Sequence, residues 1–385
     1  MPARVRAIDL PPFDPLNVRA ARLREAGHDV ISLGQALPYF PPPPSVLTAA
    51  SAALDTRDVH RYVTDPGLPA LRAALAERLG HLGVDAVADN VIITAGANHA
   101  FTLALTTLVD PGDEVLLPAP YFTNHQMAVA ALGATPIEVP VQDRDTFSVR
   151  WADIEPRVGS RTRAVVLCNP SNPTGAILDP DEGRAIVSEL ARRDIVVFSD
   201  ETYLHFVYDR AHWSAASALG WRRNVVVVGT FSKSFGMMGW RVGFMLADAA
   251  VCVEAVKIQD AMIICAPAIS QMAALAAVRD DWHYPQSFHR ELLKRRDALV
   301  DGVRSIPQLH WVPTCGAFFG FVRVEGCTDS TALAESILEQ AHVVTIPGSA
   351  FGSSGEGHLR LSYGSASMYD LTEAVRRIGD YFAGS

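Results

Sequence analysis

The stretch that decides the fold covers residues 225–243 and reads VVVVGTFSKSFGMMGWRVG. Its four valines form an apolar run without alternation, which is typical of a strand that is buried on both faces of a parallel sheet. The run leads through Thr230 into a segment that contains Lys233 and Arg241. Because ligands of open parallel sheets bind beyond the carboxyl ends of the strands, we expect this segment to lie at the functional edge of the sheet.

Lysine is rare in this chain. The sequence has 33 basic residues, but its only lysines are Lys233, Lys257 and Lys294. Lys257 and Lys294 lie in helical runs with ordinary charged neighbours, so we expect them to be solvated. Lys233 follows a strand end and is therefore the candidate for any chemistry that needs an amine.

Outside this stretch, short β-branched runs alternate with longer Ala- and Leu-rich runs between about residues 66 and 300. The alternation predicts an α/β fold with a mostly parallel sheet that helices cover. The predicted strands are residues 91–94, 114–117, 135–139, 164–168, 195–199, 225–229 and 243–246. A second, smaller α+β region is predicted to follow, with strands at 309–312, 317–324, 343–346 and 359–363 and helices at 330–341 and 368–382.

The length also predicts more than one packed region. A chain of 385 residues exceeds the roughly 250–300 residues at which a single core usually stops growing. We predict an amino-terminal segment, residues 1–45, that joins the smaller domain. Residues 46–285 are predicted to form the large domain, and residues 286–385 the small α+β domain.

Composition excludes several classes of protein. The net charge of −9 argues against broad nucleic-acid binding, which relies on a basic face. No stretch reaches the roughly 18 apolar residues of a membrane span, and the amino terminus lacks the apolar core of a signal peptide. The five dispersed cysteines form no CxxC pair, so reduced thiols in a cytoplasmic protein are expected. The histidines show no metal-ligand spacing, and no GxGxxG follows a strand.

Polar or unusual residues follow four other predicted strands. Strand 91–94 leads into Gly96, Ala97 and Asn98 at a helix start, which suits a phosphate. Strand 114–117 leads to the aromatic residues Tyr121 and Phe122, which could cover a flat cofactor. Taken singly, these features also have structural explanations, because a strand-to-helix turn needs a glycine and aromatic side chains are most often core.

The remaining two strand ends carry an amide and a carboxylate. Strand 164–168 ends in Asn-Pro-Ser-Asn-Pro-Thr-Gly, an irregular loop that leaves the Asn172 amide free to bond outward. Strand 195–199 ends in Asp200, a carboxylate that needs a cation or hydrogen-bond donors, and a structural arginine would serve equally well. Together, an amine, a carboxylate, a phosphate cradle and a stacking ring match what a protein contributes to pyridoxal phosphate chemistry.

Three motifs then occur in one order: Asn-Pro-x-Asn-Pro-Thr-Gly, Ser-Asp-Glu-x-Tyr and Ser-Lys-x-Phe-Gly-Met-x-Gly-Trp-Arg-x-Gly. From Ile31 to Tyr363 the chain resembles the class I/II aminotransferases, which are fold-type-I pyridoxal phosphate enzymes. The resemblance implies a large domain with a mostly parallel seven-stranded sheet and a smaller α+β domain. It also implies a homodimer with shared active sites, whose substrates are an amino acid and a 2-oxo acid.

The resemblance implies a role for each matching residue. Lys233 would form the internal aldimine with pyridoxal 5'-phosphate and move a proton at the substrate α-carbon. Asp200 would pair with the pyridinium nitrogen, Asn172 and Tyr203 would donate to the phenolic oxygen, and Phe122 would stack on the ring. The cofactor phosphate would be held by Gly96, Ala97, Asn98, Thr230 and Arg241, with Tyr62 reaching the phosphate of the neighbouring subunit. Arg360 would bind the substrate α-carboxylate.

Residues 32–43 are similar to the corresponding segment of glutamine transaminase K and kynurenine aminotransferases, with two departures. Ala36 replaces a family glycine that lies against the substrate carboxylate, and Tyr39 replaces an aspartate. The main prediction is amino-group transfer between an L-amino acid and a 2-oxo acid through a pyridoxamine phosphate form. The alternative is elimination, replacement, cyclisation or oxidation of an amino acid in specialised biosynthesis. A regulator built on this fold would need a fused DNA-binding region.

Overall fold

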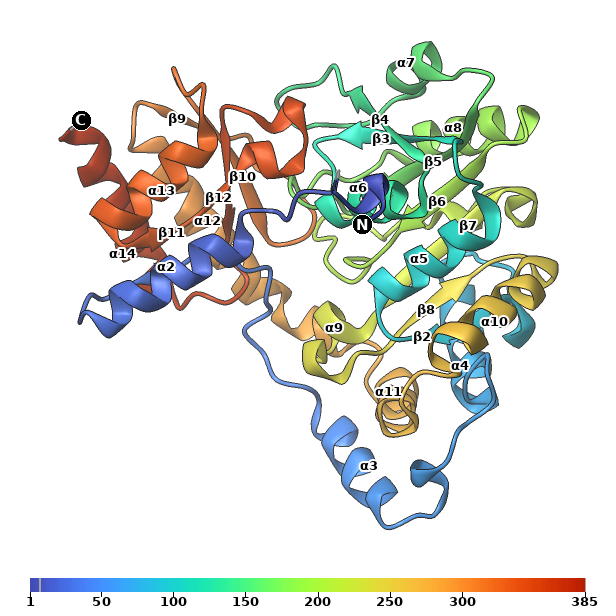
Figure 1. Ribbon diagram of the computed structural model, residues 1–385. Coiled ribbons are helices and arrows are strands. Elements are labelled where there is room, and N and C mark those ends of the chain that lie inside the picture. The colour runs from blue at the N-terminus through green and yellow to red at the C-terminus, as the bar shows by residue number, and fades with distance from the viewer. Residues whose placement is uncertain (7, 385) are drawn as a thin grey trace.

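The structure is a computed structural model that describes residues 1–6 and 8–384. Its centre is a seven-stranded sheet in the order β2-β8-β7-β6-β5-β3-β4 (Figure 1). The strands are β2 (Val91–Thr94), β3 (Glu114–Ala119), β4 (Thr135–Pro140), β5 (Thr162–Cys168), β6 (Val196–Asp200), β7 (Val225–Thr230) and β8 (Gly243–Leu246). β8 pairs antiparallel with both of its neighbours, and the other pairs are parallel. The α/β prediction is confirmed, and each predicted strand of this sheet is present within two residues at either end.

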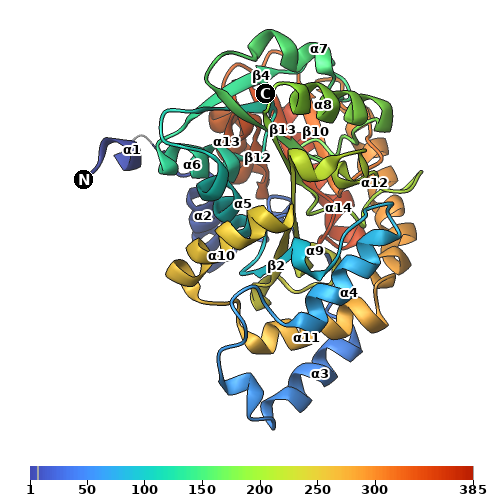
Figure 2. The same cartoon turned by 90° about the vertical axis from the view of Figure 1, so that its right-hand side faces the viewer.

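Helices cover both faces of this sheet because its strands are apolar on both sides. On one face, α3 (Pro44–Leu54), α4 (Pro69–Gly80), α8 (Pro180–Arg192) and α11 (Ala268–Asp280) pack into one apolar cluster with the strands. On the other face, α5 (Ala97–Leu108), α6 (Thr123–Leu132) and α10 (Ala249–Ile263) form a second cluster. Figure 2 shows α3, α4 and α11 side by side at one end of the molecule. Among the described residues, no helix has both the length and the apolar character needed to cross a membrane.

The smaller part is built around a four-stranded antiparallel sheet in the order β12-β13-β10-β9. Its strands are β9 (Leu309–His310), β10 (Phe319–Val324), β12 (Ile346–Pro347) and β13 (His358–Ser362), and its helices are α12 (His289–Arg304), α13 (Ser330–Ala341) and α14 (Met368–Ala383). The predicted strand 343–346 is divided in the structure, since its first half is β11 (Val343–Val344).

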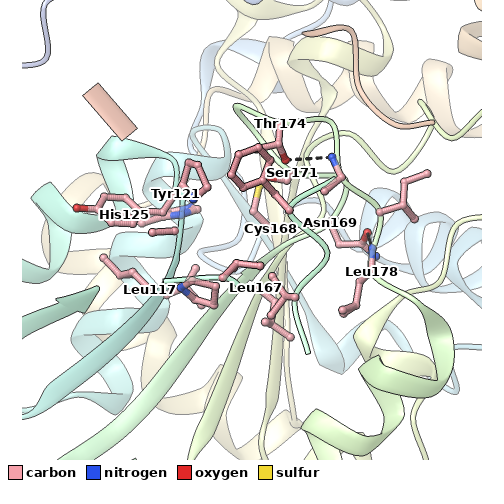
Figure 3. A pocket seen from close by; sticks show the side chains of 18 residues that line it. Leu117, Tyr121, His125, Leu167, Cys168, Asn169, Ser171, Thr174 and Leu178 are labelled. Atoms are coloured by element: carbon pink, nitrogen blue, oxygen red, sulfur yellow. Dashed lines mark hydrogen bonds between the residues drawn. The ribbon is translucent and has the colours of Figure 1, made fainter. Parts of the chain in front are cut away.

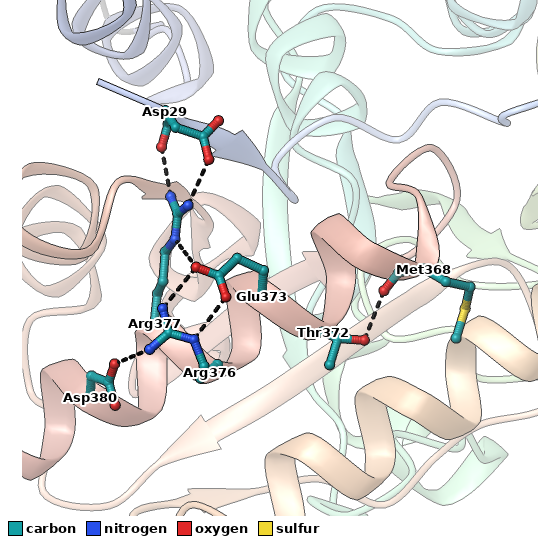
Figure 4. A network of polar contacts seen from close by, with 7 residues as sticks. All are labelled: Asp29, Met368, Thr372, Glu373, Arg376, Arg377 and Asp380. Carbon is teal, nitrogen blue, oxygen red and sulfur yellow. Dashed lines mark hydrogen bonds and ion pairs between the residues drawn. The ribbon is translucent and has the colours of Figure 1, made fainter. Parts of the chain in front are cut away.

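The amino-terminal residues pack on this smaller part. β1 (Ile31–Ser32) pairs in parallel with β11, and α2 (Phe13–Glu25) lies against α13 (Figure 1). Arg377 on α14 binds the Asp29 side chain at 2.6 Å and also pairs with Glu373 (Figure 4). This network fixes the segment that leads from Asp29 into β1 and then to residues 34–37. The domain boundaries at residues 45 and 285 stay a prediction.

Candidate active site

A cavity of about 420 Å³ opens at the carboxyl ends of β5, β6 and β7. Its volume lies in the range of small-molecule sites. The residues from the sequence prediction that line it are Ala36, Ala97, Asn98, Phe122, Asn172, Asp200, Tyr203, Thr230, Lys233, Arg241 and Arg360. Gly96 lies beside it, against Arg241. Tyr62 does not reach it, since its side chain is 78% exposed on the surface.

Lys233 lies on α9 (Phe231–Ser234), a single helical turn that directly follows β7. The Thr230 hydroxyl caps this turn by accepting a hydrogen bond from the Ser232 backbone N–H at 3.1 Å. The Lys233 Nζ atom donates to the Ala36 carbonyl oxygen at 2.7 Å. Burial and the positive charges of Arg360 and Arg241 lower the pKa of Lys233 to about 8. A large fraction of this amine is therefore neutral and nucleophilic in mildly alkaline solution.

Asp200 is the last residue of β6 and is buried at the floor of the cavity. His125 Nε2 lies 3.0 Å from one of its carboxylate oxygens, and the Thr202 backbone N–H donates to the other at 3.0 Å. Burial alone would raise the pKa of Asp200, but the hydrogen bond and charge of His125 and the contacts with Thr202 bring it below its ordinary value. The carboxylate therefore stays negative and can stabilise a protonated ring nitrogen.

Gly96 and Arg241 form an anion-binding corner at the start of α5. Gly96 caps α5 with φ +89°, a conformation that favours glycine, and a Cβ there would lie 2.5 Å from Arg241 Nη2. No side chain caps the first turn of α5, so its backbone N–H groups are available to a ligand in the cavity that Ala97 and Asn98 line. Arg241 also lies 3.5 Å from the Ser232 hydroxyl. A helix N-terminus, a guanidinium and two hydroxyls suit a phosphate dianion.

Arg360 is the most unusual charge in the protein. It lies on β13, is 3% exposed, and is surrounded by the rings of Phe13, Phe319 and Phe351 at 5.0–5.6 Å. Its guanidinium donates to the Asn172 Oδ1 atom at 2.9 Å and to the Gly34 carbonyl, while Nε has no partner. Within the described part of the chain, no carboxylate pairs with it.

This buried guanidinium needs an anion. Burial lowers the pKa of Arg360 to about 10, so the group still carries its charge at neutral pH. An unpaired buried cation is costly, and a carboxylate from a ligand would remove the cost. Every residue of β13 is buried. The aromatic rings, and not solvent, surround it.

Two aromatic side chains flank the same cavity. Tyr203 is buried and packs edge-on against Phe318 and Phe319, and burial raises its pKa well above the ordinary value. Its hydroxyl therefore remains protonated and can donate a hydrogen bond. Phe122 forms the N-cap of α6 and meets the His125 ring edge-on, with ring centres 5.4 Å apart. The Phe122 ring borders the cavity beside Asp200.

A second, much smaller cavity has a volume of about 40 Å³ (Figure 3). Tyr121, His125 and Thr174 line it, and Cys168 borders both cavities. Burial and the negative charge of Asp200 raise the pKa of Cys168 well above its ordinary value. The Cys168 thiol is therefore uncharged where it borders the two cavities, and it is not activated for reaction.

Several site residues were missed at the sequence level. Ser232 adjoins Lys233 and could have been found from that position alone. His125 lies three residues after Phe122, but nothing local connects it with Asp200, which is 75 positions away. Phe13, Asp14 and Asn17 also line the cavity, and they come from a helix, α2, that the sequence did not predict. Only the fold brings these residues to the site.

The sheet order and the lysine-bearing cavity at its carboxyl edge place the protein among the α/β transferases. The chain belongs to the family of class I and II aminotransferases, because the family model "Aminotransferase class I and II" matches residues 28–378. It is similar to an aspartate aminotransferase of Pyrococcus horikoshii, with 35% identity over 91% of this chain and 90% of that one. It is equally similar to aromatic-amino-acid aminotransferase 2 of Thermococcus litoralis, with 35% identity and the same coverage.

A solved structure supports the same assignment. An aromatic aminotransferase from Pyrococcus horikoshii superposes with a TM-score of 0.88 and 35% identity, covering 95% of this chain and 99% of that one. The predicted family, fold class and reaction are confirmed: the protein is an aminotransferase, and amino and 2-oxo acids are the substrates of this family. The family uses pyridoxal phosphate. The alternative reactions that Ala36 and Tyr39 suggested find no support in these relatives. The finer likeness to glutamine transaminase K stays a prediction.

The lowered pKa of Lys233 can be tested in the cofactor-free protein. We expect Lys233 to be acetylated at half its maximal rate near pH 8, because the neutral amine is the reactive form and its pKa is about 8. Lys257 and Lys294 are exposed on α10 and α12 and serve as internal references. Competitive labelling with peptide mass spectrometry measures all three. A pH profile for Lys233 that parallels those of the two references would contradict the assignment.

Proposed function

We propose that this aminotransferase binds pyridoxal phosphate in the cavity described above, with Lys233 as its attachment point. The residues present fit the group: the amine is partly neutral, the carboxylate of Asp200 is buried and negative, and a Cβ at Gly96 would fill the corner beside Arg241. When bound, the cofactor would supply an electrophilic carbonyl and an electron-accepting ring. The phosphate would take the corner formed by Gly96, Ala97, Asn98, Thr230 and Arg241.

The chain's own residues divide the remaining work. The Lys233 amine is positioned to take a proton from the substrate α-carbon and to return it. Asp200 would place negative charge at the ring nitrogen of the cofactor, and His125 keeps that carboxylate ionised. Asn172 and Tyr203 can donate to the phenolic oxygen. The Asn172 amide has its oxygen engaged by Arg360, so its NH₂ group is the end left for a ligand. Phe122, which lines the cavity, would cover one face of the ring and exclude water from it.

One observation carries the proposal, namely the buried and unpaired Arg360. A 2-amino acid and a 2-oxo acid share only the α-carboxylate and the adjacent carbon. A guanidinium that binds this carboxylate with two parallel hydrogen bonds fixes the α-carbon next to Lys233 for both substrates. The same group therefore serves both halves of amino-group transfer.

Replacing Arg360 tests this assignment. Arg360→Gln should raise the KM for amino acids at least about thirtyfold, because one partner of a buried, hydrogen-bonded charge pair is removed. Slow turnover of a simple amine without a carboxylate should not change. Arg323→Gln on the neighbouring strand β10, where Arg323 is exposed, is the matched control. Steady-state kinetics over a panel of amino acids with a 2-oxo acid measure the effect, and an unchanged KM would refute the role of Arg360.

We further propose that the preferred amino acid has an aromatic or other uncharged side chain. The three cations that line the cavity are Lys233, Arg241 and Arg360. In the proposed complex, Lys233 is the attachment point of the cofactor, Arg241 binds its phosphate and Arg360 binds the substrate α-carboxylate. The other described residues of the wall add no further cation, and they include Phe13, Asp14, Asn17, Gln35, Leu37, Asn124 and Ile346. Asp14 would repel a second substrate carboxylate. The two relatives are named as an aspartate aminotransferase and an aromatic-amino-acid aminotransferase, so both classes of amino acid should be compared as substrates.

The charge of Asp14 gives a direct test of this preference. Asp14→Lys should raise kcat/KM for aspartate about tenfold, because an attraction replaces a repulsion at the rim of the cavity. Activity toward phenylalanine should change little. Asp9→Lys alters the charge of an exposed residue in the same segment and is the control. If wild-type enzyme prefers aspartate, or if both variants act alike, the proposed preference is wrong.

We also propose that the active unit is a homodimer. The Tyr62 side chain is exposed and lies outside its own cavity, as expected of a residue that serves the neighbouring subunit. Two apolar side chains near the end of α10, Met262 and Ile263, are exposed as well. A second copy of the chain would cover such side chains and complete the phosphate site.

Subunit exchange tests the dimer. Lys233→Ala and Tyr62→Ala each damage a site, but a mixed dimer has one site that holds both wild-type residues. Mixing the two variants should therefore recover about a quarter of the wild-type activity at limiting pyridoxal phosphate, because half of the dimers are mixed. Light scattering should give twice the chain mass of 41.6 kDa. A monomer, or no recovery on mixing, would contradict the shared site.

The cysteines support a cytoplasmic location, which we also propose. All five are free in the structure, and four of them are only partly buried. Such thiols persist in a reducing compartment.

A further inference from the structure

Glu138 lies on β4, the outermost strand of the large sheet, and faces a loop of the smaller part. Its carboxylate accepts four hydrogen bonds from two consecutive residues of that loop. The backbone N–H groups of Ser353 and Ser354 both donate at 2.9 Å, and their hydroxyls donate at 2.8 Å and 2.7 Å. Figure 1 shows this loop, between β12 and β13, beside the β3 and β4 edge of the sheet.

The loop packs tightly against the sheet at Gly352. Gly352 has φ +101°, and a Cβ there would lie 2.8 Å from the Tyr121 ring and 2.9 Å from the Glu138 carboxylate. Burial would raise the pKa of Glu138, but the hydrogen bonds from the two serines bring it below the ordinary value. The carboxylate therefore stays charged across the neutral range, and the contacts are charge-assisted.

The same loop contacts active-site segments of both the large sheet and the smaller part. The Tyr121 backbone N–H donates to the Phe351 carbonyl at 3.0 Å, and Tyr121 directly precedes Phe122, the proposed stacking ring. On the other side, the Phe351 ring lies 5.1 Å from the Arg360 guanidinium. The loop then enters β13, which carries Arg360. A displacement of the loop would therefore move Arg360 relative to the cofactor-binding cavity.

We propose that Glu138 is a positioning residue that sets the distance between the substrate-carboxylate site at Arg360 and the large-domain half of the active site. This inference rests on the proposed roles of Arg360 and the cavity. Glu138 touches neither substrate nor cofactor. It acts through Ser353, Ser354 and Phe351, and its loss loosens the placement of Arg360 while leaving Lys233 and Asp200 in position.

Glu138→Gln tests the proposal in the holoenzyme. Oε1 accepts three of the four hydrogen bonds and Oε2 accepts only the one from the Ser353 N–H. The amide therefore keeps one acceptor oxygen for three of the bonds, turns an NH₂ group toward the Ser353 N–H, and removes the negative charge that assists all four. We expect the KM for the amino donor, and the Kd for the non-reacting carboxylate 3-phenylpropionate, to rise about tenfold, since one hydrogen bond disappears and the other three lose their charge assistance. The kcat should change less than about threefold, and the absorption spectrum of the bound cofactor should not change.

Glu114→Gln is the matched control, because Glu114 lies at the opposite end of the adjacent strand β3 and accepts hydrogen bonds from Arg161. The double variant Ser353→Ala and Ser354→Ala removes only the two hydroxyl donors and should give a smaller rise in Kd. This double variant also tests the role of the Glu138 contact if Glu138→Gln fails to fold. The inference is overturned if the double variant binds 3-phenylpropionate like wild type, or if Glu138→Gln weakens binding no more than Glu114→Gln.

Arg360→Gln separates this inference from the proposed function. If Arg360→Gln weakens binding of 3-phenylpropionate and Glu138→Gln does not, only the role of Glu138 fails. If neither variant weakens binding, the carboxylate site itself is wrongly placed. A loss of cofactor absorbance in Glu138→Gln, with unchanged Kd in the double variant, would also overturn the positioning role.

Discussion

The parallel register of β5, β6 and β7 brings residues from three distant stretches of the chain to one level. Cys168 is paired with Asp200, and Asp200 with Val228, so β5 and β6 end at the same level and β7 ends two residues beyond them. The segments that follow these ends must turn away from the sheet at the same edge. Asn172, Tyr203 and Lys233 meet for that reason. The strand register brings these three residues together, and no short-range sequence pattern links them.

Unpaired charge is the second feature on which function depends. The protein is acidic overall, with a net charge of −9, yet the cavity contains three cations and its buried Arg360 has no acidic partner among the described residues. Aromatic rings and two backbone or amide oxygens hold this guanidinium in place without neutralising it. Such a site is stabilised most by a ligand that brings its own negative charge. Substrate and cofactor phosphate both do so.

The sequence was sufficient for the fold class and for most of the candidate site, because the relevant signals are local. The valine run of β7, the amides after β5 and the carboxylate after β6 each stand within a few residues of a strand end. His125 could not be found in this way, because its link to Asp200 depends on how α6 packs on the sheet. Helix α2 was missed because only Leu16 and Ala20 of its residues are buried, so its sequence is mostly polar, and its place beside the cavity depends on the fold. The contact of Glu138 with residues 353–354 spans more than 200 positions.

The two departures from the family pattern show how misleading single substitutions are without packing. Tyr39 does not line the cavity; its ring lies 3.9 Å from the Arg295 guanidinium and packs edge-on against Phe288. Ala36 does line it, but its contact with Lys233 is made by the backbone carbonyl, which any residue would provide. Neither substitution brings a new acid, base or nucleophile into the cavity. Phe13, Asp14 and Asn17 of α2 line the cavity, so the proposed choice of substrate depends on α2 and its neighbours, while the proposed reaction depends on the residues at the strand ends.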